Sequence, residues 1–233
     1  ACHNTTLGGD NYQVSGDYAG YAQSEMERLQ PGATAMFLLL CGGDQNPNPR
    51  GTVGHAEQYG KALATEVNRV LGSAKPLPLD LKTAFQITEL AFAPHTREQF
   101  EQESKDENKF KASRAREMLR AYDERRPVRG TPYPVQAIRL SKGLTLLALG
   151  GEVVVDYALR AKKEFAGTDL IVAGYSNDVM CYIPSLRVLR EGGYEGETSM
   201  IYYGQPGKFS EEVEETVFRS IHGVMKQAGV KTR

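Results

Sequence analysis

The sequence predicts an α/β fold: a mixed, twisted sheet flanked by helices, with polar groups collected at the strand ends. Two observations predict this fold. Short apolar runs typical of buried strands alternate along the chain with amphipathic segments of helical periodicity. In addition, 40% of the 233 residues are hydrophobic and 24% are charged, which is the composition of a globular protein with a sizeable core. One large domain or two small ones would both fit this length.

The predicted helices carry apolar side chains three and four residues apart. Segment 97–126 is highly charged. Within the Arg-rich stretch 109–129 the basic residues are interleaved with Glu117, Asp123 and Glu124, which favours a solvated helix face over a site for anions or nucleic acid. Segment 211–227 has an apolar stripe, with Ser210 as its expected N-cap and Gly229 beyond its end. The predicted helices are 17–30, 52–71, 97–126, 153–165 and 211–227.

The predicted strands are short apolar runs or alternating segments. Residues 36–41 are all apolar and are typical of a buried strand, and the Gly- and Pro-rich loop GGDQNPNPR follows them at 42–50. Segments 133–140 and 144–149 are expected to pair around a Ser-Lys-Gly turn. The predicted strands are 34–41, 81–93 (one or two strands), 133–140, 144–149 and 169–173.

Composition excludes several classes of protein. The formal net charge is −1 and the pI is about 6.5, so the basic footprint of a nucleic-acid-binding protein is absent. The apolar run 36–41 is far shorter than the roughly 20 residues that span a bilayer, and no transmembrane segment is expected. The cysteines, Cys2, Cys41 and Cys181, are odd in number and far apart, so neither a disulfide framework nor a Cys-x-x-Cys zinc motif is predicted.

Polar side chains follow the predicted strands at several points. His3 is expected at the end of a truncated strand and precedes a polar, Gly-rich loop. Glu152 follows the apolar run 144–149 and two glycines. A third polar cluster with Tyr182 follows strand 169–173, and Asp44 follows strand 34–41. Ligands collect at strand ends in α/β sheets, and one His, one Glu and Tyr or Asp oxygens would suit zinc. A structural histidine at His3 and a first-turn helix glutamate at Glu152 remain the alternatives.

The order of these blocks resembles the neutral/alkaline (non-lysosomal) ceramidase family. The blocks are ACHNTTLGGD, GDYAGYAQSEMER, FLLLCGGDQNPN, LALGGE, AGYSNDVMCYIPS and GGYEGETSMIYYG, which together span about residues 1–205. The family consists of zinc-dependent amide hydrolases that cleave ceramide into sphingosine and a fatty acid. The resemblance implies that residues 1–233 are part of a ceramidase-like catalytic domain whose N-terminal part is missing, either as a fragment or as a processed half.

Site residues are carried over from the family by this resemblance. His3 matches a zinc histidine, Glu152 the zinc carboxylate and Tyr182 the zinc-associated tyrosine. Tyr194 matches a second active-site tyrosine that contacts the scissile amide, and Asp44 matches the aspartate of the family's Gly-Asp loop. The resemblance also implies that one further zinc histidine lies upstream of this chain.

One departure from the family concerns the loop after the first strand. The family has a serine there that ceramide hydrolysis requires, and this chain has Asn46 in its place. Asparagine can donate and accept hydrogen bonds but is not a nucleophile. The implied function is zinc-dependent hydrolysis of an amide (N-acyl) bond, with sphingolipid-type substrates included and peripheral membrane contact compatible with them. The implied location is secreted or periplasmic.

Two alternatives stay open at this point. A ceramidase-like protein that has lost catalysis and binds a ligand or metal would account for Asn46. An unrelated α/β binding module with an accidental motif match is the other. The partners expected are a small-molecule or lipid amide and the missing N-terminal part of the same protein, with no nucleic acid.

Overall fold

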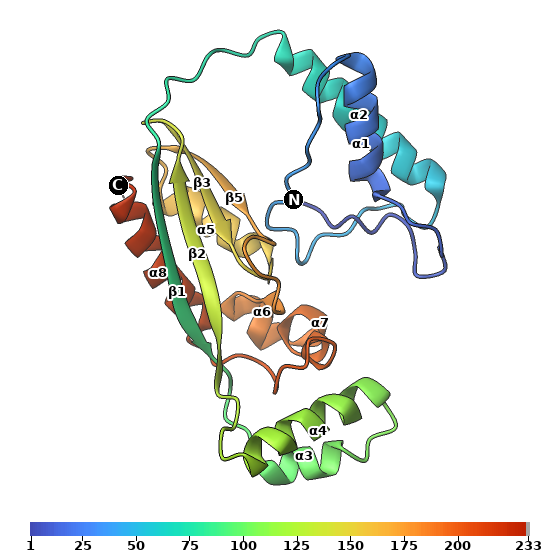
Figure 1. Ribbon diagram of the computed structural model, residues 1–233, viewed down its shortest axis with the longest axis vertical. Helices are drawn as coiled ribbons and strands as arrows, with labels where there is room; N and C mark the ends of the chain where they lie inside the picture. Colours follow the sequence, from blue (N-terminus) through green and yellow to red (C-terminus); the bar gives the residue numbers. More distant parts are fainter. Residues whose placement is uncertain (232–233) are drawn as a thin grey trace.

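The computed structural model describes residues 1–231, and it confirms the α/β class (Figure 1). The main sheet has the order β1-β2-β3-β5, formed by β1 (Lys82–Ala91), β2 (Gly130–Arg139), β3 (Leu144–Leu149) and β5 (Asp169–Ala173). The first three strands are antiparallel, and β3 and β5 are parallel. The sheet is therefore mixed, as the sequence predicts.

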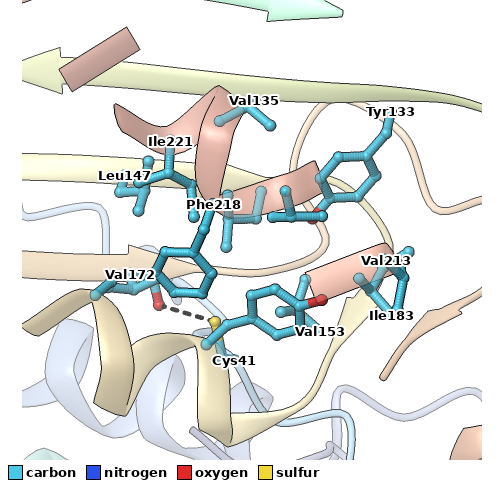
Figure 2. Close-up of a cluster of buried hydrophobic side chains, with 14 of the residues drawn as sticks. Cys41, Tyr133, Val135, Leu147, Val153, Val172, Ile183, Val213, Phe218 and Ile221 are labelled. Carbon is cyan, nitrogen blue, oxygen red and sulfur yellow. Dashed lines mark hydrogen bonds between the residues drawn. The ribbon is translucent and has the colours of Figure 1, made fainter. Parts of the chain in front are cut away.

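Helices α5 (Val155–Glu164) and α8 (Val213–Gln227) cover one face of this sheet. Tyr157 of α5 stacks on Phe218 of α8, with ring centroids 5.7 Å apart. Figure 2 shows how these helices pack over the inward-facing side chains of the strands. The labelled members of this core are Cys41, Tyr133, Val135, Leu147, Val153, Val172, Ile183, Val213, Phe218 and Ile221. All of them are almost completely buried, so this layer supplies most of the hydrophobic stabilisation.

Helices α1 (Asp17–Leu29) and α2 (Val53–Leu71) form a hairpin that packs on itself beside the sheet (Figure 1). The two helices approach closely at Gly60, where a Cβ atom would lie 2.4 Å from Cβ of Tyr21 and 2.7 Å from the carbonyl oxygen of Tyr18. A glycine is therefore required at this crossing. The side chain of Thr52 caps α2 by accepting from the backbone N–H of His55.

A second helical hairpin connects β1 to β2 in the sequence. The predicted helix 97–126 is two helices, α3 (Arg97–Glu103) and α4 (Lys109–Asp123), because Asn108 caps α4 with its side chain and starts a new helix there. Phe100, Ala115 and Met118 form a small separate core in this hairpin. The buried guanidinium of Arg114 connects the hairpin to Pro206, whose carbonyl oxygen accepts at 2.6 Å.

The remaining elements are short and surround the site. They are β4 (Glu152–Val153), β6 (Tyr182–Ile183), α6 (Leu186–Glu191), α7 (Gly193–Gly196) and the 3-10 helix η1 (Thr198–Ile201). Strands β4 and β6 pair in parallel as a separate two-stranded sheet. No helix within residues 1–231 is long and apolar enough to cross a bilayer.

Besides the division of 97–126, three further predictions about elements were wrong in detail. Residues 34–41 are extended but do not form a strand, and they make a single bridge between Leu40 and Ala173. Ser210 does not cap α8, because the helix begins after Glu212 without a side-chain cap. His3 does not lie at the end of a strand, since the structure assigns residues 1–5 to no strand.

Candidate functional site

Strands β4 and β6 bring two separate segments of the site together. Their parallel register places Glu152 opposite Tyr182. The chain enters β4 through Gly151, whose φ is +74°, and a Cβ atom at this position would lie 2.6 Å from Cγ1 of Ile183. Glycine is therefore needed both for the left-handed backbone and for the close approach of β6. Glu152 lies in β4, before the helix N-cap Val154, so it is not the first-turn glutamate of the alternative interpretation.

His3 reaches the same point through the Gly-Asp loop. Its backbone N–H donates to the carbonyl oxygen of Gln45 at 2.9 Å, and its ring Nε2 lies 3.0 Å from the carbonyl oxygen of Gly43. Gly43 in turn donates from its backbone to Val153 of β4 at 2.9 Å. A Cβ atom on Gly43 would lie 2.6 Å from the carbonyl oxygen of Glu152. The loop thus holds His3 against β4 by backbone contacts that only glycine permits.

The donor atoms of the three predicted metal ligands lie within contact distance. His3 Nε2 is 3.6 Å from Oε2 of Glu152 and 3.3 Å from the hydroxyl of Tyr182. Tetrahedral zinc with bonds of 2.0–2.2 Å has ligand atoms about 3.3–3.6 Å apart. The side chains of His3 and Glu152 are each only 12% exposed, so the cluster is shielded from solvent.

Two further tyrosines complete the cluster, and the sequence analysis did not single them out. Tyr175 donates to Oε2 of Glu152 at 3.1 Å and lies 3.2 Å from Nδ1 of His3. Tyr203 donates to the other carboxylate oxygen, Oε1. Both residues lie inside quoted blocks, AGYSND and MIYYG, and a tyrosine beside a glycine-containing loop is the signal that could have identified them.

The phenols of Tyr175 and Tyr182 are held in their neutral form. Burial raises the pKa of both well above the ordinary tyrosine value, and the negative charge of Glu152 raises each pKa further. Burial also raises the pKa of Tyr194, more modestly. At neutral pH these three hydroxyls are therefore hydrogen-bond donors beside one carboxylate.

Tyr194 lies at the open side of the cluster. Its ring makes an edge contact with Tyr182, with centroids 5.5 Å apart, and the residue is 46% exposed. Tyr202 lies next to it at 6.2 Å. This position suits a group that meets a substrate arriving from solvent.

Asp44 and Asn46 lie in the Gly-Asp loop but outside this contact set. Oδ1 of Asp44 accepts from the backbone N–H of Val155 at 2.8 Å and so binds the first turn of α5. Oδ1 of Asn46 accepts from Thr5 at 2.8 Å and from Arg50 at 3.2 Å. Asn46 is exposed and lines a mainly apolar cavity of about 610 Å³ with Cys2, Tyr18, Phe37, Leu38, Leu40, Pro47, Asn48, Tyr59 and Leu63 among its other walls. The structure gives no contact from Asn46 to His3 or Tyr194.

The donor set fits part of a zinc shell. One imidazole, one carboxylate and the phenol of Tyr182 are ligand types that zinc-binding proteins use or that can complete such a shell. Within residues 1–231 no group of three or more His, Cys, Asp and Glu residues could hold a metal ion. A further nitrogen donor from outside these residues would be needed for an ordinary zinc site.

Two solved structures of ceramidases share the fold of this chain. The model resembles the crystal structure of neutral ceramidase from Pseudomonas aeruginosa with a TM-score of 0.66 and 16% identity, covering 100% of this chain and 44% of that one. It also resembles a ceramidase complexed with C2, with a TM-score of 0.67 and 15% identity, covering 99% of this chain and 45% of that one.

The chain therefore has the fold of part of a neutral ceramidase, as the resemblance in sequence predicted, and it spans less than half the length of these solved proteins. No protein-family model and no curated protein matches the sequence. At this level of identity the likeness establishes the fold.

Proposed function

We propose that this chain contributes the Glu152 half of a zinc-dependent hydrolase site that cleaves an amide (N-acyl) bond, in the manner of a ceramidase. The observation that carries the proposal is the approach of Glu152 and Tyr182 to one atom of His3, since His3 Nε2 lies 3.6 Å from Oε2 of Glu152 and 3.3 Å from the hydroxyl of Tyr182. The ceramidase fold of the chain supports the same chemistry. A sphingolipid-type N-acyl compound is the substrate class that follows.

In the proposed reaction each site residue would have a distinct role. His3 and Glu152 would hold the metal, with Tyr182 beside them. Zinc, when bound, would lower the pKa of a water molecule toward about 7 and polarise the substrate carbonyl. In the net reaction the C–N bond breaks, the water oxygen joins the acyl carbon, and a proton passes to the leaving amine. A fatty acid and an amine result.

The tyrosines would stabilise the charge that develops on the carbonyl oxygen. Their raised pKa values keep Tyr182 and Tyr194 protonated, so that both can donate to an oxyanion. Tyr194 is the more exposed of the two and would meet the substrate first. Removing one such donor typically reduces the rate by about 10² to 10³.

The test combines zinc binding with turnover of a short-chain fluorescent ceramide, on the natural protein at its full length. Glu152→Gln should abolish both zinc binding and turnover, because the amide is a poor metal ligand. Glu107→Gln is the matched control, since Glu107 is exposed on the loop between α3 and α4. Unchanged zinc affinity in Glu152→Gln would contradict the metal assignment.

A second candidate function is favoured by Asn46 alone. If the site binds zinc and an N-acyl ligand but does not turn it over, the chain belongs to a ceramidase-like binding protein. Zinc-dependent binding of the fluorescent ceramide, without release of fatty acid from a panel of N-acyl substrates, would identify that case.

A further inference from the structure

The most apolar run of the chain lies extended and unpaired. Residues 36–41 are MFLLLC, yet Met36 is 89% exposed and Leu38 is 51% exposed. Within residues 1–231 the backbone of 36–39 makes no hydrogen bond to another backbone group, and Leu40 makes a single antiparallel bridge to Ala173 at the end of β5. This segment has the apolar sequence of a buried strand, but residues 36–39 have no neighbouring strand.

The main sheet also has an uncovered apolar face. Helices α5 and α8 cover the face that carries Val135 and Leu147. Side chains alternate along a strand, so the residues between these point to the opposite face. There, Phe85 is 51% exposed, Ile87 is 60% exposed, and Ile138, Leu146 and Ile171 are only partly buried. An exposed sheet face is normally polar, whereas this one carries apolar side chains on all four strands, with Gln136 and Glu89 among its polar members.

A third apolar surface adjoins the unpaired segment. Met36, Phe37 and Leu38 line a groove of about 410 Å³ together with residues of α1 and α2. On α2, the walls include Leu63, Val67 and Leu71, which are 38%, 36% and 47% exposed. Contiguous exposed apolar surface of this kind marks a place where another polypeptide packs.

We propose that a strand of polypeptide from outside these 233 residues pairs with residues 36–39, and that the layer carrying it covers the apolar surface around Met36 and Leu38. The pairing is β-strand addition, in which backbone hydrogen bonds give the affinity and alternate side chains enter apolar sites. The partner strand must itself be apolar, because this surface presents no charged side chain among the groove residues.

The occupant corresponds to the part of the solved ceramidases that this chain does not match. The match covers 99–100% of this chain but only 44–45% of the length of each solved ceramidase. More than half of each therefore remains to supply strands and a covering layer. The proposal rests on this likeness of fold and not on the proposed chemistry, so failure of catalysis would leave it standing.

Hydrogen–deuterium exchange of peptides that cover 34–41 tests the pairing. Ala35, which donates to Glu27, and Leu40, which bridges Ala173, are left out of the comparison. In the 233-residue chain alone the amides of residues 36–39 should exchange at the rate of an unprotected backbone. In the natural protein at its full length they should exchange at least about 100-fold more slowly, because strand hydrogen bonds must open first. Unprotected amides in the natural protein would overturn the proposal.

A second copy of the chain is the competing occupant, and concentration distinguishes it. Protection that appears in the 233-residue chain alone and rises with its concentration would assign the surface to self-association and overturn the proposal. Leu38→Lys should remove the protection in the natural protein, whereas Leu159→Lys, at an exposed leucine of α5, should not. Protection that survives Leu38→Lys would also contradict the proposed partner strand.

Discussion

The hydroxyl of Tyr203 donates a hydrogen bond to Oε1 of Glu152, across 51 residues of sequence. Tyr175 donates to Oε2 of the same carboxylate at 3.1 Å. Each carboxylate oxygen therefore has a phenol donor, and the plane of the carboxylate is fixed by two separate segments of the chain. The Oε2 atom that faces His3 is held in place before any metal or substrate arrives.

The two tyrosines should act as positioning residues for the metal ligand Glu152. Partners that orient a ligand typically contribute about 10- to 100-fold in metal affinity. We expect Tyr203→Phe and Tyr175→Phe each to weaken zinc binding within that range, measured by competition with a chromogenic chelator. Tyr202→Phe is the control, because Tyr202 is exposed and makes no contact with Glu152. Equal zinc affinities for all three variants would show that the hydrogen bonds do not orient the carboxylate.

Asp44 should contribute to stability through the start of α5. Its carboxylate accepts from the backbone N–H of Val155, and α5 has no cap from its own N-cap residue Val154. Loss of a capping acceptor costs about 0.5–2 kcal/mol. We expect Asp44→Ala to lower the free energy of unfolding by that amount in urea, with an unchanged m value.

Asp44→Asn separates this role from a direct role in the reaction. The amide oxygen keeps an acceptor for Val155, so this variant should recover most of the stability. If the variant is stable but turnover still falls by orders of magnitude, the carboxylate also serves the reaction, as the ceramidase resemblance implies. Asp10→Ala, at an exposed loop position, controls for the loss of one negative charge.

His95 should make the stability of the protein depend on pH. Its Nε2 donates to the carbonyl oxygen of Val128 at 2.6 Å, and Nδ1 lies 3.1 Å from the hydroxyl of Tyr122. Burial lowers the pKa of His95; the hydrogen bond to Val128 opposes this shift, and the charges of Arg129 and Arg114 add to it. The unfolded chain then takes up the proton at a higher pH than the folded protein does.

The sign of the effect follows from that difference. The contribution of neutral His95 to the free energy of unfolding is fully present above the ordinary histidine pKa of about 6.5. It is lost as the pH falls toward the lower pKa of His95 in the folded protein. Urea unfolding at pH 8, 7, 6 and 5.5 should show this loss in the wild type and a shallower slope in His95→Gln. Parallel slopes for the two proteins would assign the pH dependence to other groups.

The sequence predicts local elements well where the pattern is local. The helix predicted over 52–71 is α2 from Val53 to Leu71, and the hairpin predicted over 133–149 is β2 and β3. It failed for 34–41, because an apolar run predicts a strand but not the presence of a partner strand. It predicted one helical segment over 97–126, whereas the structure has two helices there, because the side chain of Asn108 caps a new helix.

The sequence predicts individual candidate residues of the site but not the contacts between residues that are far apart in the chain. His3, Glu152 and Tyr182 lie together, because β4 pairs with β6 and the Gly-Asp loop holds His3 against β4; their role as metal ligands stays a prediction. Tyr175 and Tyr203 were missed because their contacts with Glu152 cross 23 and 51 residues, and no spacing rule connects such positions. Whether Asn46 takes part in the reaction stays a prediction, since its contacts in the structure are with Thr5 and Arg50.

Asn46→Ser tests what the loop contributes to ceramide hydrolysis. The resemblance in sequence implies that ceramidases have serine at this position, and asparagine can hydrogen-bond a substrate but cannot act as a nucleophile. Asn46 is exposed, so the substitution should leave the melting temperature nearly unchanged while removing the acceptor for Thr5 and Arg50. We expect zinc affinity to stay the same, because Asn46 makes no contact with His3 or Glu152.

Turnover of a short-chain fluorescent ceramide should rise in Asn46→Ser, by about 10² to 10³ if the serine supplies one transition-state hydrogen bond. Asn48→Ser is the matched control, two residues along the same loop and also exposed. A gain confined to Asn46→Ser would mean that the fold retains a ceramidase site in which one group has been replaced. Equal, zinc-dependent turnover in the wild type and the variant would mean that activated water suffices without the serine. Zinc binding without turnover in either protein would contradict ceramide as the substrate and favour the binding function. The metal ligands would then be intact while the hydrolysis was absent.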